Sequence, residues 1–147
     1  MGSEMCIRDR PKVVPNFLRH FQFNVQDGKF PFSGSDKDHL YGWVRYKQAP
    51  EHFGFAHLIG ILDAWPPTVL QIPRKPTAAS TISWNIEFIQ PQNLPAPDQW
   101  IAFQDNTRQA SHGYSHTDAN IWNENGELIA LSPVSYTHLT LPTIYSV

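Results

Sequence analysis

The feature that most constrains the fold is a continuous apolar stretch, FGFAHLIGILDAW, which covers residues 53–65 and ends at Pro66 and Pro67. A helix that is apolar on nearly every face is expected to be buried on every face. The stretch is shorter than the ~20 apolar residues that a membrane-spanning helix needs. The sequence therefore predicts a short central helix that is wrapped by sheet and stops at the two prolines.

Segments in which apolar and polar residues alternate surround this stretch and predict strands. The clearest is residues 80–90, where Ile82, Trp84, Ile86 and Phe88 share one face. Further strands are expected at residues 16–26, 40–47, 99–108, 113–123 and 128–131. Two strands, a buried helix and then a meander of strands indicate an α+β domain.

The composition excludes several classes of function. The formal net charge is −2 and no basic run is present, which argues against a nucleic-acid-binding surface. Cys6 is the single cysteine, so a disulfide framework and a cysteine metal site are both excluded. The sequence contains no glycine-rich phosphate loop and no nucleophile elbow. We expect neither a nucleic-acid partner nor a membrane partner.

Two polar residues are candidates for chemistry. Asp63 lies near the C-terminal end of the predicted helix, where the helix dipole disfavours a carboxylate by roughly 0.3–1 kcal/mol. It is either a general base or a solvated aspartate that opens the turn at Pro66. Thr81 lies on the polar face of the strand predicted at residues 80–90, a position typical of a solvent-facing side chain.

The histidines do not indicate a metal site. His112 and His116 would lie about 13 Å apart on one face of a strand at ~3.3 Å per residue, too far to hold one ion. His57, inside the apolar stretch, is expected to be a core histidine with its hydrogen bonds satisfied.

Both ends of the chain resemble translated sequencing adapters. Residues 1–10 read MGSEMCIRDR, and residues 134–143 read VSYTHLTLPT. We therefore expect the natural domain to span residues 11–132, with residues 1–10 and 133–147 derived from adapter. About 120 residues is enough for one domain with a modest core.

Four blocks, in this order, resemble the C-terminal half of the type II, TesB-like acyl-CoA thioesterases. They read KFPFSGSDKDHLYGWVRY, GFAHLIGILDAWPPTVLQ, ASTISWNIEF and GYSHTDANIWNENGELIALS. The resemblance implies a hotdog domain, in which an antiparallel sheet wraps around a central helix. It also implies that this domain is one half of a double hotdog.

The resemblance assigns site residues. The family's helix-end aspartate matches Asp63, and its strand hydroxyl matches Thr81, with Ser80 or Ser83 as alternatives if the register differs by a residue or two. The family's glutamine is expected where this chain has Val134. These groups would activate a water molecule, backbone N–H groups would stabilise the oxyanion, and neither a metal nor a cofactor is needed.

The implied function is hydrolysis of acyl-CoA in cytoplasmic fatty acid metabolism, although the chain as it stands is expected to be inactive without the glutamine. Two alternatives remain: a dehydratase or hydratase acting on CoA thioesters, and a non-catalytic hotdog half that binds acyl chains. The expected partners are acyl-CoA and either an N-terminal hotdog half or a second copy of this chain. Because a lone hotdog leaves a strand edge open, we also expect self-association.

Overall fold

A computed structural model describes residues 15–138. The helical elements are the 3-10 helix η2 (Asn16–His20), α1 (Phe55–Asp63) and the 3-10 helix η3 (Thr68–Gln71). The strands are β1 (Phe21–Asp27), β2 (His39–Tyr46), β3 (Ala79–Trp84), β4 (Glu87–Phe88), β5 (Ile101–Ser111), β6 (Tyr114–Trp122) and β7 (Leu128–His138).

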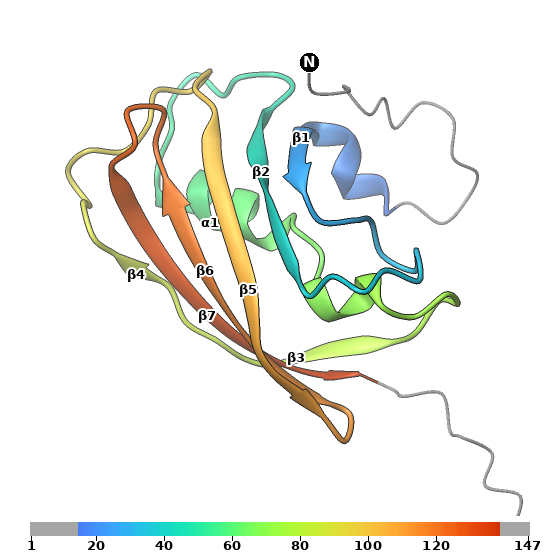
Figure 1. Cartoon of the computed structure of the whole chain (residues 1–147). Helices are drawn as coiled ribbons and strands as arrows, with labels where there is room; N and C mark the ends of the chain where they lie inside the picture. The colour runs from blue at the N-terminus through green and yellow to red at the C-terminus, as the bar shows by residue number, and fades with distance from the viewer. Residues whose placement is uncertain (1–14, 139–147) are drawn as a thin grey trace, which may run out of the picture.

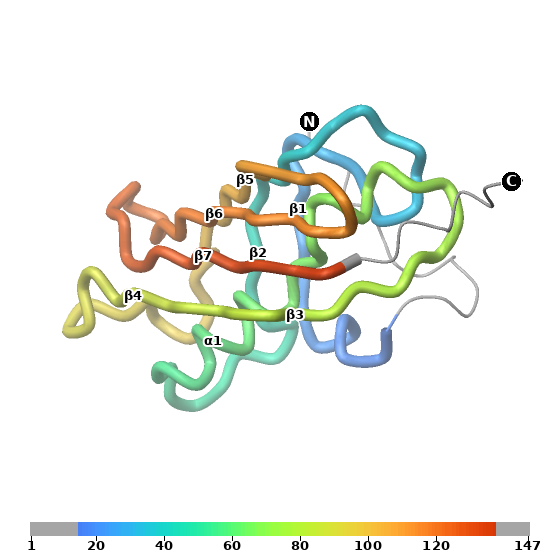
Figure 2. Tube along the Cα trace, turned by 90° about the horizontal axis from the view of Figure 1, so that it is seen from below, coloured from blue at the N-terminus to red at the C-terminus, as the bar shows by residue number. Residues whose placement is uncertain are grey.

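The strands form one antiparallel sheet in the order β1-β2-β5-β6-β7-β3, and β4 also pairs with β7. In Figure 1 the strands β5, β6 and β7 lie in front of α1. Figure 2 shows β4 and β3 following one another along the edge of the sheet beside β7. This is the architecture that the family resemblance implies, a sheet curved around one helix.

Two tight turns connect the long strands β5, β6 and β7. His112 and Gly113 have φ values of 51° and 79°, and the flanking residues Ser111 and Tyr114 pair across the hairpin. Positive φ at both central positions is typical of the two-residue turn that matches the twist of antiparallel strands. At the next turn, the Asn123 side chain accepts hydrogen bonds from the backbone of Asn125 and Glu127.

The hydrophobic core lies between α1 and the sheet. Leu58, Ile61 and Leu62 are the buried residues of α1. Trp65, just beyond the helix, stacks on Phe103 of β5 with ring centroids 4.7 Å apart and planes 6° from parallel. This stacking contact packs the segment that follows α1 against β5 in the sheet.

The prediction of a helix buried on every face is wrong. Phe55 is 42% exposed, and Ala56 and Asp63 are also exposed. The sheet of this chain covers one face of α1, so the apolar residues on the opposite face remain open to solvent.

Two strand predictions also need correction. Residues 16–20 form η2 rather than the first part of a strand, directly after Pro15. Residues 80–90 divide into β3 and β4, and the register of β3 shifts between Thr81 and Ser83. A bulge of this kind interrupts the regular alternation of an edge strand, and Ile82, placed on the same face as Trp84 by the alternation, is 48% exposed.

The last strand is longer than expected. β7 continues to His138 instead of ending at residue 131, and it pairs with β3 and β6 along residues 133–138. This extension includes residues that resemble adapter, so they form part of the sheet in this chain. The domain limits at residues 11 and 132 stay a prediction.

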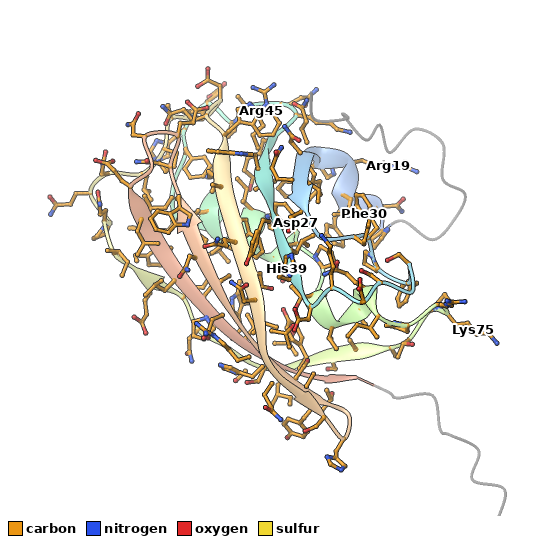
Figure 3. The ribbon with its side chains drawn as sticks, viewed as in Figure 1. Arg19, Asp27, Phe30, His39, Arg45 and Lys75 are labelled. Carbon is orange, nitrogen blue, oxygen red and sulfur yellow. The ribbon has the colours of Figure 1, made fainter. Side chains whose placement is uncertain are left out.

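A charged cluster connects β1 to β2. The Asp27 carboxylate contacts Lys37 and accepts a hydrogen bond from His39 Nε2 at 2.9 Å. Figure 3 shows Asp27 and His39 close together on the neighbouring strands. Hydrogen bonds from Lys37 and then His39 hold the pKa of Asp27 well below its usual range. The carboxylate is therefore ionised at neutral pH.

None of the helices in the described part of the chain combines the length and the apolar character needed to cross a membrane.

Candidate active site

A small cavity lies where the end of α1 meets strands β3 and β7. Its volume is about 30 Å³, and a space of this size has room for a water molecule. The lining residues come from α1 and the segment after it, from β3, and from β5, β6 and β7. They are Leu62, Asp63, Trp65, Thr81, Trp84, Phe103, Asp105, Ala119, Ser132, Val134 and Tyr136.

Asp63 reaches this cavity because α1 ends there. Asp63 is the last residue of the helix, and the N–H of the following Ala64 still donates to the carbonyl oxygens of Gly60 and Ile61. The Asp63 side chain is exposed rather than buried. A carboxylate in this position is reachable by a ligand and lines the cavity at the same time.

Thr81 lines the cavity from the edge strand β3. It lies opposite Tyr136 in the pairing of β3 with β7. Of the three hydroxyl residues considered on this strand, Thr81 lines the cavity, whereas Ser80 and Ser83 do not. The structure thus brings Asp63 and Thr81 together at one cavity.

Val134 completes the set of three predicted positions. In β7 it pairs with Trp84 of β3 on one side and with Thr117 of β6 on the other, and it lines the same cavity as Asp63 and Thr81. The position at which the family resemblance predicts a glutamine is therefore at the cavity wall.

Asp105 is a second carboxyl group of this cavity, and it was not among the site residues predicted from the sequence. It is 4% exposed, and its Oδ1 atom has no hydrogen-bond partner within residues 15–138. Burial raises its pKa to about 7, and the nearby Thr117 hydroxyl and the Asn106 backbone N–H oppose the shift only in part. The signal was present in the sequence, because strict alternation along β5 places residue 105 on the same face as Ile101 and Phe103.

Two aromatic side chains border the same cavity. Burial raises the pKa of the Tyr136 hydroxyl, and the charges of Asp105 and Asp63 raise it further. Trp84 Nε1 donates to Ser132 Oγ at 2.8 Å. Trp65 Nε1, by contrast, is buried and finds no acceptor in the described part of the chain.

The histidines lie in structural roles away from this cavity. His57 Nδ1 accepts a hydrogen bond from the Gly54 N–H at 3.1 Å at the start of α1. His116 contacts Ser135 Oγ at 2.9 Å, and His112 lies in the hairpin turn. Among residues 15–138, no group of three or more His, Cys, Asp or Glu side chains is arranged to hold a metal ion.

Comparison with known proteins shows the family. The profile described as "Acyl-CoA thioesterase C-terminal domain" matches residues 4–133. The chain therefore belongs to the family of acyl-CoA thioesterase C-terminal domains. A search of curated protein sequences found no match.

Solved structures share the fold. A hot dog fold protein of unknown function from Alicyclobacillus acidocaldarius has a TM-score of 0.66 at 16% identity, covering 89% of this chain and 55% of that one. Acyl-CoA thioesterase II TesB2 from Mycobacterium marinum has a TM-score of 0.65 at 13% identity, covering 92% and 55%. The Streptococcus mutans protein smu.793, bound to acetyl CoA, has a TM-score of 0.58 at 11% identity, covering 80% and 89%.

The fold is thus a hotdog, as the sequence predicted. The chain spans about half the length of the thioesterase II structure and of the A. acidocaldarius protein, at 55% of each.

Proposed function

We propose that the domain hydrolyses acyl-CoA thioesters to a free acid and CoA, with Asp63 as the general base. The observation that carries this proposal is the convergence of residues 63, 81 and 134 on one cavity. These positions lie far apart in the sequence and are the ones that the family resemblance selects. A structural neighbour bound to acetyl CoA supports the choice of substrate class.

The proposed reaction needs no covalent intermediate. Asp63 takes a proton from a water molecule as the water oxygen attacks the thioester carbonyl carbon. Thr81 orients this water through its hydroxyl group. When the tetrahedral intermediate collapses, the carbon–sulfur bond breaks and the CoA thiolate receives the proton from Asp63. A side-chain amide at position 134 would hold the water on its third side.

The test introduces a side-chain amide at position 134 by mutation. We expect the Val134→Gln variant to hydrolyse acyl-CoA, measured as thiol release over a series of chain lengths, at a rate at least tenfold above the unsubstituted chain. Val134→Leu is the matched control, because it changes the size of the side chain without adding an amide. Acyl-CoA binding without thiol release in the Val134→Gln variant would favour the non-catalytic module. Formation of an enoyl or hydroxyacyl product would favour the dehydratase or hydratase.

We also propose that the domain packs against a second hotdog domain. In solutions of this chain alone, this partner is a second copy of the chain. Ile82, Ile89 and Phe55 are 48%, 45% and 42% exposed. Phe55 packs against Phe88 of β4 with ring centroids 4.6 Å apart, so this apolar surface continues onto the open edge of the sheet. Exposed edges and apolar patches both favour association.

We therefore expect light scattering to give a mass at least twice that of the 16.8 kDa chain at micromolar concentration. Ile82→Lys places a charge on the edge strand and is expected to lower the associated fraction. Lys47→Ala, far along the chain in the exposed turn after β2, serves as the control. A monomer at every concentration would contradict this assembly.

A further inference from the structure

Two buried polar atoms beside the cavity lack the partners that such atoms normally have. They are Trp65 Nε1 and Asp105 Oδ1, and neither is hydrogen-bonded to any residue that the structure describes. Both residues line the cavity that Asp63 also borders. A buried polar atom without a partner costs about 1–3 kcal/mol, and a catalytic role is one of the explanations for such an atom.

Burial determines the chemical form of Asp105. At 4% exposure the carboxyl group is shielded from water, and the neutral form is favoured over the charged one. A neutral carboxyl group carries an O–H donor. A protonated carboxyl group in an apolar setting is one of the known ways to donate a hydrogen bond to developing negative charge.

The charged group that acts on Asp105 is Asp118 of β6, whose negative charge raises the pKa of Asp105 further, whereas the Thr117 hydroxyl and the Asn106 N–H lower it in part. Asp63 at the end of α1 and Tyr136 of β7 line the same cavity. These neighbours supply no cation that would favour the carboxylate. Trp65 contributes an indole N–H, which is a donor only.

We propose that Trp65 Nε1–H and the neutral carboxyl group of Asp105 form the oxyanion hole of this site, both donating to the thioester carbonyl oxygen as it becomes negative. The inference rests on the proposed hydrolysis and replaces backbone N–H groups as the expected donors. The two donors bind the oxygen, Asp63 takes the proton of the attacking water, and Asp105 keeps its own proton throughout. Fixed donors aimed at developing charge are worth about 10²–10³ in turnover each.

The experiment uses the Val134→Gln chain as the parent. Trp65→Phe keeps an aromatic ring on Phe103 and removes the N–H, and Asp105→Val removes the carboxyl group. Each is expected to lower kcat for acyl-CoA by about 10²–10³-fold while KM changes less than about threefold. Asp105→Asn retains a donor, so its kcat stays within about tenfold of the parent. Trp100→Phe is the matched aromatic control, and we expect parental kcat, because Trp100 lies under Arg45 rather than at the cavity.

The pH profile separates this role from a purely structural one. We expect kcat of the parent to fall above about pH 7 as Asp105 ionises, and kcat of Asp105→Asn to stay level there. Parental turnover in both Trp65→Phe and Asp105→Val would overturn the inference. A loss of affinity for a non-hydrolysable thioether analogue as large as the loss of kcat would also overturn the inference. A thioether has no carbonyl oxygen to accept these hydrogen bonds, so that result would indicate general damage to the site. If the parent itself releases no thiol, the proposed hydrolysis fails, which is a different result from an active parent that is indifferent to these two substitutions.

Discussion

In the Val134→Gln chain, replacing Asp63 by asparagine is expected to lower kcat for acyl-CoA by about 10²–10⁴-fold. The carboxylate is the group proposed to take the proton from water, and general-base catalysis contributes in this range. Asparagine has nearly the same shape but does not accept a proton at neutral pH. Because Asp63 is exposed at the end of α1, the substitution removes the base without opening the core. Thiol release under saturating substrate measures the effect.

Asp98→Asn is the matched control, since this exposed residue lies in the loop before β5. It makes the same chemical change outside the cavity, and we expect parental turnover. The Asp63→Asn variant should melt within a few degrees of its parent, so that a loss of turnover is not a loss of folded protein. Unchanged hydrolysis in Asp63→Asn would exclude the general-base role.

The second large effect is on stability. Replacing Asp105 by asparagine is expected to remove a pH dependence of unfolding between about pH 4 and pH 7. The pKa of Asp105 is raised from 3.8 to about 7 in the folded chain, mainly by burial. Between these values the native state holds a proton that the unfolded state has released. The free energy of unfolding therefore falls as pH rises, by up to about 1.4 kcal/mol per pH unit.

Over the whole interval, the pKa shift corresponds to about 4 kcal/mol. Denaturant unfolding of both chains at several pH values between 4 and 8 measures it. We expect Asp105→Asn to gain stability relative to the parent as pH rises, with the two chains most alike near pH 4. Other titrating groups cancel in this difference, since both chains share them. A difference that is independent of pH would show that Asp105 ionises normally and would contradict its burial as a neutral group.

Local patterns were sufficient to predict most of the secondary structure. The apolar stretch at residues 53–65 predicted α1, and alternation predicted β2, β5 and β6 close to their observed positions. The errors came where tertiary pairing overrode a local pattern. Alternation placed Ile82 on the same face as Trp84, but the register of β3 against β7 shifts at this residue and Ile82 is 48% exposed, and no local pattern in the sequence indicates that shift.

The sequence by itself determined the family, the order of the elements and the candidacy of Asp63 and Thr81, because motifs and side-chain periodicity are properties of neighbouring residues. Only the tertiary structure decided that residues 63, 81 and 134 border one cavity, that the outer face of α1 is left uncovered, and that Asp105 is a buried carboxyl group beside them. The physical reason is that a cavity and the ionisation of a buried group depend on the packing of α1, β3, β5 and β7, segments that lie far apart in the chain.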